Sequence, residues 1–311
     1  MTETVSEQFQ RLLEDDGDQR GHLPDRDAAS FVRDLLARTE DTSYLRGYAD
    51  TCPVEGAEPH DYAGRVLQLS ETCTVLVAIH FRGRDRRFPF VDVSAQTSPL
   101  PEPTPLATLV SPFKMFEPKA VRVWRLGSED APPGGEDDIL VVGGRLHELS
   151  ATPDLPQLAR IRLEPDESLA SYDSFLEMYQ AGHEMNPDSK DWLQPESKST
   201  LSVCASDGGL YRVFIDDEHV GLIAARRGSY RGWVGWEIVE EVLHPAYRGQ
   251  RLAAPMQQAF LRRLDERTCQ SVFGTIAARN VASLRVAQRV GRRVVEVGCL
   301  VSITSVADDS R

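Results

Sequence analysis

One stretch decides the fold of this chain: Gly235-Trp-Glu-Ile-Val-Glu-Glu-Val-Leu-His-Pro-Ala-Tyr-Arg-Gly-Gln-Arg-Leu-Ala-Ala-Pro-Met256. Its first part, Trp236 to Leu243, is rich in β-branched residues and carries a tryptophan, a composition typical of a β-strand. His244-Pro245 ends this strand, because proline cannot donate a hydrogen bond to a ladder and holds its neighbour extended. The stretch therefore predicts a strand that stops at Leu243.

A basic turn then leads into a helix. The turn is Arg248-Gly-Gln-Arg-Leu-Ala253, and the helix presents an apolar face from Leu252 to Leu264. The first N–H groups of a helix have no partner within it, and the helix dipole favours negative charge there. The corner therefore predicts an anion site, to which Arg248 and Arg251 add positive charge. The alternative is an ordinary strand-to-helix corner on a solvated basic face.

A second segment favours the anion site. Asn280-Val-Ala-Ser-Leu-Arg-Val-Ala-Gln-Arg-Val-Gly291 follows a strand-like run, Ser271-Val-Phe-Gly-Thr-Ile-Ala277. Together the two segments resemble the GNAT superfamily of acyl-CoA-dependent N-acyltransferases. The first resembles its pyrophosphate motif, Arg/Gln-x-x-Gly-x-Gly/Ala, after a Val/Leu-His-Pro strand end. The second resembles its Asn-x-x-Ser/Ala helix that ends in Gly.

The resemblance covers residues 156–306, about half of the chain, and implies a fold. That fold is of the α+β class, an α/β/α sandwich around a central mixed, mostly antiparallel sheet. The strand and helix patterns along these residues follow the order β-α-β-β-β-α-β-α-β that the resemblance implies.

The resemblance also implies acetyl-CoA as co-substrate and assigns residues to it. Main-chain groups of Val242 and Leu243 would hold the pantetheine arm and the thioester carbonyl. Backbone amides of the turn would hold the pyrophosphate; they belong to Arg248, Gly249, Gln250, Arg251, Leu252 and Ala253. Asn280 and Ser283 match positions near the thiol end and the phosphates, although Asn280 has an equally good structural use as a helix cap. The chain departs from the motif at Arg251, which replaces the family's middle glycine and would either crowd the pyrophosphate or reach it as a cation.

Acetyl transfer to an amine requires a group that accepts the amine proton. The central strand offers Glu237, Glu240 and Glu241. Strand periodicity places Glu237 and Glu241 on one face and Glu240 on the other. The resemblance puts Glu237 where some family members carry a catalytic glutamate, so we expect Glu237 as the base and Glu241 as the second candidate. The alternative is that both are solvated or ion-paired strand residues.

Many family members place a general-acid tyrosine seven residues after the asparagine, where this chain has Ala287. Another group would then protonate the thiolate, or no dedicated acid is needed. The candidates are Cys299, Ser283, Tyr230 and a water molecule. His183 lies in a polar segment that borders the acceptor site in this fold, although a single histidine there is more often merely exposed.

Composition limits the class of protein. The chain has 311 residues, five scattered cysteines and a net charge of −13. An acidic protein is a poor candidate for nonspecific nucleic-acid binding. No run approaches the roughly 18–20 apolar residues that span a bilayer, the N-terminus lacks the pattern of a signal peptide, and no histidines cluster at metal spacing. We expect a cytoplasmic protein, monomeric or homodimeric, without metal, membrane or nucleic-acid partners.

The first half predicts a second α+β domain. A helix over 27–39 precedes strand-like runs at 65–69, 74–81, 88–93, 120–125 and 139–142, with a short helix around 106–116. We expect mostly antiparallel strands here and residues 1–26 to be loosely held. This half is compatible with a degenerate GNAT-like domain or with an unrelated accessory domain. The boundary is expected near Thr152-Pro153-Asp154, giving domains 1–153 and 154–311.

The sequence therefore predicts an acetyl-CoA-dependent N-acetyltransferase that transfers the acetyl group directly to a primary amine of a small molecule or protein. The alternative from another class is a non-catalytic acyl-CoA-binding or regulatory module, which Arg251 and Ala287 motivate. A third hypothesis keeps the fold but uses a longer acyl-CoA.

Overall fold

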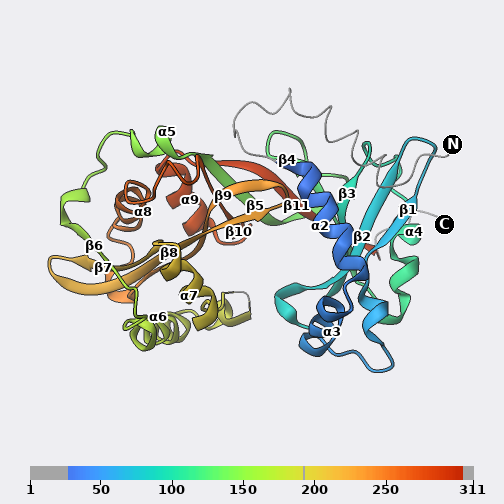
Figure 1. Ribbon diagram of the computed structural model, residues 1–311, viewed down its shortest axis with the longest axis horizontal. Coiled ribbons are helices and arrows are strands. Elements are labelled where there is room, and N and C mark those ends of the chain that lie inside the picture. Colours follow the sequence, from blue (N-terminus) through green and yellow to red (C-terminus); the bar gives the residue numbers. More distant parts are fainter. Residues whose placement is uncertain (1–26, 192, 304–311) are drawn as a thin grey trace. The chain divides into compact units, whose positions relative to one another are not determined.

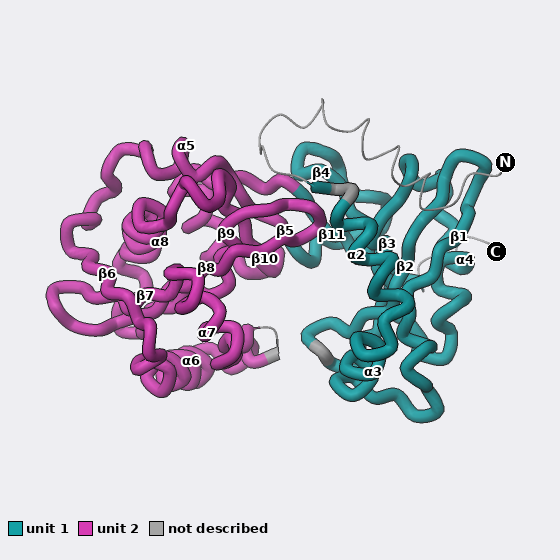
Figure 2. Tube along the Cα trace, viewed as in Figure 1, with its two compact units in different colours: residues 1–20, 27–139, 296–311 teal, residues 21–26, 140–295 magenta. Residues whose placement is uncertain are grey.

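The computed structural model describes residues 27–191 and 193–303, so the expectation for residues 1–26 lies outside the described residues. The chain divides into two compact units (Figures 1 and 2). Of the described residues, unit 1 contains 27–139 and 296–303, and unit 2 contains 140–295. The chain enters unit 2 within strand β5 (Gly135–Arg145) and leaves it within strand β11 (Arg293–Ser302).

This division differs from the expected boundary near residue 153. The segment that follows β5 is fastened to unit 2 by Gln258, which is completely buried. Its Oε1 accepts from the backbone N–H of Leu155 at 2.8 Å, and its Nε2 donates to the carbonyl of Pro153 at 2.8 Å. Residues 146–155 therefore belong with the second unit. The end of the chain also differs from the prediction: β11 was expected in the second domain, but from Glu296 onward it belongs to unit 1.

Unit 1 contains strands in the order β1-β2-β3-β4-β11. All neighbouring pairs are antiparallel except β3 with β4, which is parallel. Asp27 caps the first described helix by accepting from the N–H of Ser30, and the helix that follows it was not predicted. The elements have these bounds: α2 Ala28–Glu40, α3 Thr42–Thr51, β1 Arg65–Gln68, β2 Thr74–Phe81, β3 Pro89–Gln96, α4 Leu106–Val110 and β4 Ala120–Leu126.

Unit 2 contains strands in the order β10-β9-β8-β7-β6. Pairing is antiparallel from β6 to β9, and β9 pairs with β10 in parallel, so the predicted mixed, mostly antiparallel sheet is confirmed. The elements have these bounds: α5 Leu146–Ser150, β6 Ile161–Pro165, α6 Tyr172–Met185, α7 Lys198–Ser206, β7 Leu210–Ile215, β8 Glu218–Tyr230, β9 Trp233–Leu243, α8 Ala253–Leu261, β10 Ser271–Ala277 and α9 Val281–Arg289. Helix α7 was not predicted.

Two apolar cores cover the two faces of this sheet. One joins the sheet to α5 and α8, and the other joins it to α6 and α7 (Figure 1). The adjacent residues Val242 and Leu243 belong to different cores, because successive side chains of a strand point to opposite faces. The end of β9 is therefore held from both sides.

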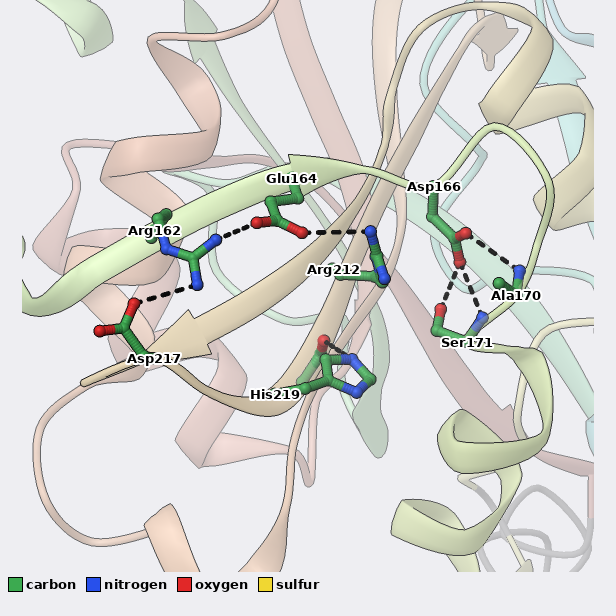
Figure 3. A network of polar contacts seen from close by, with 9 residues as sticks. Arg162, Glu164, Asp166, Ala170, Ser171, Arg212, Asp217 and His219 are labelled. Carbon is green, nitrogen blue, oxygen red and sulfur yellow. Dashed lines mark hydrogen bonds and ion pairs between the residues drawn. The ribbon is translucent and has the colours of Figure 1, made fainter.

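A polar network holds the outer edge of unit 2 (Figure 3). Arg212 of β7 donates to Glu164 of β6 at 3.1 Å, and Arg162 pairs with the same carboxylate. Asp166, which is buried, accepts from the N–H groups of Ala170 and Ser171 at 3.0 and 3.1 Å. These bonds order the turn that leads into α6, and α6 forms one wall of the cavity described below.

A β-bulge in β9 changes which side chains share a face. Ala224 of β8 is opposite Glu240, but the next residue, Ala225, is opposite Ile238, so Val239 is the extra residue. The expected sharing of a face by Glu237 and Glu241 is therefore wrong. Beyond the bulge, Glu240 faces α6 and Glu241 faces α8, where each makes a hydrogen bond.

Candidate functional site

Unit 2 contains a cavity of about 770 Å³ that reaches both faces of the sheet at the end of β9. It is lined by α6 and the segment after it, by the end of β9, by the turn into α8, and by the start of α9. Among the residues predicted to bind the cofactor, these line it: Val242, Leu243, Arg248, Gly249, Arg251, Leu252, Ala253, Asn280 and Ser283. Gln250 does not, and its side chain instead donates to the carbonyl of Ala246 at 2.9 Å.

The cavity opens where β9 and β10 part. Their parallel pairing is confined to Val272 opposite Trp236 and Phe273 opposite Glu237. From Glu240 to Leu243, β9 keeps its partner β8 on one edge, while among the described residues no strand pairs with its other edge. Backbone polar groups on such an edge seek partners, so this stretch can pair with an extended ligand as a further strand would.

The turn after β9 presents backbone N–H groups. Gly249 and Arg251 have positive φ angles of 75° and 62°, and Leu252 returns to the right-handed region. Such alternation turns successive N–H groups toward one point and creates a concave anion site. Leu252 is the N-cap of α8 and provides no side-chain cap, so the first N–H groups of this helix are not capped by it.

Pro255 is compatible with this arrangement. It lies in the first turn of α8, where a missing N–H removes no bond within the helix. The remaining donors of this turn and the positive end of the dipole face the cavity through Leu252 and Ala253, which both line it.

Arg248 was expected to add charge to the anion site, but its side chain also holds neighbouring elements together. Its Nε donates to the carbonyl of Leu243 at 3.0 Å, which ties the turn to the end of β9. Its guanidinium lies over Gly182 of α6, where an added Cβ would come within 2.8 Å of it. Burial lowers the pKa of Arg248 from its usual value.

Asn280 caps α9. Its side chain accepts from the N–H of Ser283 at 3.2 Å, so the structural use predicted for Asn280 is present. Both residues also line the cavity, and their use in cofactor binding stays a prediction.

The charge of the lining is strongly positive although the whole chain is acidic. Its residues include one carboxylate, Glu241, and four arginines: Arg248, Arg251, Arg279 and Arg285. Positive side chains around a concave site concentrate anionic ligands there. The cavity therefore suits an elongated ligand with an anionic end.

The two carboxylates predicted as bases are separated. Glu237 is not among the lining residues and forms an ion pair with Arg226, with 2.8 Å between the nitrogen and oxygen. Glu241 lines the cavity, and its Oε2 accepts from Gln257 Nε2 at 2.5 Å. Burial raises the pKa of Glu241 to about 7, against the opposing effects of Gln257 and Arg292.

Tyr179 and Glu240 form a polar pair that sequence reasoning did not assign to the site. Tyr179 lines the α6 side of the cavity, and its hydroxyl lies 2.9 and 3.0 Å from the two oxygens of Glu240. Burial raises the pKa of Glu240 to about 7, and it also raises the pKa of Tyr179 far above its usual value. No sequence signal linked Tyr179 to this site.

His183 and Ser189 form a second pair on the same wall. His183 Nδ1 lies 2.9 Å from Ser189 Oγ, and Ser189 Oγ donates to the carbonyl of Asn186 at 2.7 Å. Ser189 is buried, His183 is half-buried, and all three residues line the cavity.

Comparison with known proteins agrees with this geometry. The family model for the acetyltransferase (GNAT) domain matches residues 145–293. This part of the chain is a GNAT domain. No curated protein sequence matches the chain significantly.

Several solved structures match the chain at low sequence identity. A GCN5-related N-acetyltransferase from Sphaerobacter thermophilus is 14% identical with a TM-score of 0.49, over 84% of this chain and 92% of that one. A GNAT-family acetyltransferase from Colwellia psychrerythraea is 12% identical with a TM-score of 0.48, over 85% and 96%. An aminoglycoside acetyltransferase from an uncultured soil metagenomic sample is 13% identical with a TM-score of 0.33, over 43% and 88%.

The substitutes considered for the missing tyrosine of the GNAT domain have different surroundings. Ala287 is completely buried in α9 and does not line the cavity. Cys299 lies in unit 1 beside Arg125 and Asp137, and burial raises the pKa of its thiol. Tyr230 is not among the lining residues, whereas Ser283 is. Of the three named side chains, only Ser283 borders the cavity of the GNAT domain.

Two further findings concern the described residues. They contain no group of three or more histidines, cysteines or acidic residues that could hold a metal ion. None of their helices has the length and apolar character needed to cross a membrane.

Proposed function

We propose that the protein is an acetyl-CoA-dependent N-acetyltransferase that transfers the acetyl group directly to a primary amine. One observation carries the proposal: a single cavity borders the edge of β9 with which no described strand pairs, the start of α8, which Leu252 does not cap, and four arginines. Coenzyme A needs this combination, because it has an extended amide-containing arm and an anionic pyrophosphate end. The GNAT domain supports acyl-CoA-dependent transfer in general.

In this proposal the pyrophosphate lies on the amides of the turn from Arg248 to Ala253, including that of Gln250. Arg251 supplies charge beside it, and Asn280 and Ser283 border it from α9. The pantetheine arm pairs with the edge of β9 beyond its pairing with β10, and main-chain groups of Val242 and Leu243 lie beside the thioester. Held this way, the thioester and the amine react as one complex, which removes much of the entropic barrier.

The proposed catalytic carboxylates have unequal support. Glu241 borders the cavity, whereas Glu237 is engaged with Arg226 outside its lining. If a carboxylate of β9 contacts the reacting groups, Glu241 is therefore the better candidate. Its pKa of about 7 leaves it partly protonated at neutral pH.

The non-catalytic alternative rests on Arg251 and Ala287. The arginine lines the cavity at the motif's glycine position, and the alanine provides no acid. A binding module with this cavity would retain acyl-CoA but release no thiol when amines are added.

An assay of CoA thiol release distinguishes the two functions. Purified protein is given acetyl-CoA with spermidine, a lysine-containing peptide or an aminoglycoside, and succinyl-CoA replaces acetyl-CoA as a control for acyl length. We expect release that depends on an amine and on the acetyl donor. Binding of acetyl-CoA without amine-dependent release would support the module instead.

The proposal includes the compartment and the oligomeric state of the protein. No disulfide joins the five cysteines, which all lie among the described residues, and we propose a cytoplasmic protein, monomeric or homodimeric.

A further inference from the structure

The strongest unused feature of the cavity is the hydrogen-bonded chain from His183 to Ser189 to Asn186. A serine hydroxyl has one proton to donate. Ser189 Oγ donates it to the carbonyl of Asn186 at 2.7 Å, so Oγ can only accept from His183 Nδ1, 2.9 Å away. Nδ1 therefore carries the ring proton, and Nε2 carries the lone pair.

The surroundings keep this lone pair available. Among the residues that the structure describes, none forms a hydrogen bond to Nε2, and His183 lines the cavity. Burial, and then the charges of Lys190 and Arg248, lowers the pKa of His183 from its usual value, so the ring is neutral near pH 7. The carboxylate of Glu240 is on the same side of the sheet but is occupied by the Tyr179 hydroxyl.

We propose that His183 Nε2 accepts the proton of the acceptor amine, and that Ser189 positions the ring for this role. The inference rests on the proposed function and gives it a base that lies on α6 rather than on β9. Glu241 is less suited to this role because it faces α8, where Gln257 holds its carboxylate and Arg292 lies nearby.

The amine nitrogen bonds to the thioester carbonyl carbon, the carbon–sulfur bond breaks, and the nitrogen loses one proton to Nε2. The departing thiolate takes a proton from solvent, and the imidazolium returns its proton to solvent. No further reactant is needed.

The arrangement also indicates the class of acceptor. The wall around His183 contributes a neutral imidazole, a phenol and a serine, and the charges that act on the ring are those of Lys190 and Arg248. A cation-rich lining disfavours polycations and favours an amine with one positive charge or a nearby anionic group. Among the three amines of the release assay, the lysine-containing peptide should therefore outperform spermidine when it carries an acidic neighbour.

The test compares His183→Ala and Ser189→Ala with the wild type, using the peptide and acetyl-CoA. The matched control is His219→Gln, since His219 is also half-buried with a lowered pKa but is absent from the lining. We expect kcat/KM to fall roughly 100-fold for His183→Ala, with partial recovery on adding imidazole, and roughly 10-fold for Ser189→Ala. The control should match the wild type, and calorimetry should show unchanged acetyl-CoA affinity in all variants.

The pH profile gives a second readout. The acid limb of kcat/KM should lie below the usual histidine value of 6.5, because Lys190, Arg248 and burial all favour the neutral ring. Wild-type activity retained in His183→Ala, or a loss explained by weaker acetyl-CoA binding, would overturn the assignment alone. Absence of amine-dependent release by the wild type would overturn the proposed function and the assignment together.

Discussion

Arg251 combines a residue type and a backbone conformation that rarely occur together. Its φ of 62° lies in the left-handed region, which costs a residue other than glycine about 1–2 kcal/mol. Its exposed side chain lines the cavity, so the substitution of the motif's glycine exchanges backbone freedom for a positive charge.

Two variants separate the effect of the positive charge from the effect of the backbone strain. Arg251→Ala removes the charge and keeps the strain, whereas Arg251→Gly removes both. We expect Arg251→Gly to be about 1 kcal/mol more stable than Arg251→Ala in urea unfolding, with equal losses of acetyl-CoA affinity. Equal stability of the two variants would show that the turn is not strained.

The buried carboxylates make stability depend on pH. Glu240 and Glu241 have a pKa of about 7 in the folded chain, against an ordinary value of 4.5. These two groups therefore bind more protons in the folded chain between these values, so their contribution to stability is greatest below about pH 4.5 and is lost as pH rises to about 7. Each group contributes a slope of up to about 1.4 kcal/mol per pH unit.

Glu240→Gln should reduce this slope by up to about half. The measurement is urea unfolding at several pH values between the two pKa values, with Glu184→Gln on the exposed side of α6 as a control for the loss of a carboxylate. A slope unchanged by Glu240→Gln would mean that Glu240 is ionised in the folded chain throughout this range.

At the scale of elements, the strand, turn and helix from Trp236 to Leu261 were predictable from local chemistry. A strand rich in β-branched residues, a proline and an apolar helical face each act within a few residues. The bulge at Val239 was not predictable, because nothing in the local sequence states that β8 pairs out of step there. Because of that one extra residue, Glu241 and Glu237 lie on opposite faces of the sheet. Periodicity alone therefore could not assign the faces of the candidate carboxylates.

Side-chain pairs that form only when the chain is folded also could not be predicted from the local sequence. His183 was recognised as a residue near the acceptor side, but its partner Ser189 becomes visible only when α6 and the following turn are in place. Tyr179 and Glu240 are 61 positions apart and meet through the fold.

Gln258 joins α8 to the segment after β5 and offers a test at this scale. Its buried amide bonds to Leu155, Thr152 and Pro153. Gln258→Ala should destabilise the chain by about 3 kcal/mol, because a buried N–H and a carbonyl would lose their partner and a cavity would remain. Gln288→Ala, at an exposed position of α9, should change stability by less than about 0.5 kcal/mol. Similar small effects at both positions would mean that the segment is held by other contacts.

For the whole molecule, the predicted limit between two parts differs from the division into units 1 and 2, which falls after Ile139 and before Glu296. The boundary was expected near Thr152-Pro153-Asp154, but Thr152 and Asp154 accept hydrogen bonds from Arg262 at the end of α8, and the GNAT match begins at residue 145. The overall charge of −13 also concealed the arginines that gather around one cavity. Both features depend on which distant segments meet, and composition does not contain that information.

The central claim is that the cavity holds acetyl-CoA with its phosphates at the start of α8, and isothermal calorimetry of one pair of variants tests it most directly. Ala253→Asp places a carboxylate at the first position of α8, where it is favourable for the helix but repels a phosphate, and Ala253→Asn is its neutral match. We expect the wild type and Ala253→Asn to bind acetyl-CoA, and Ala253→Asp to stay folded and bind roughly 100-fold more weakly. Absence of binding by the folded wild type, or equal affinity of the two variants, would contradict the account.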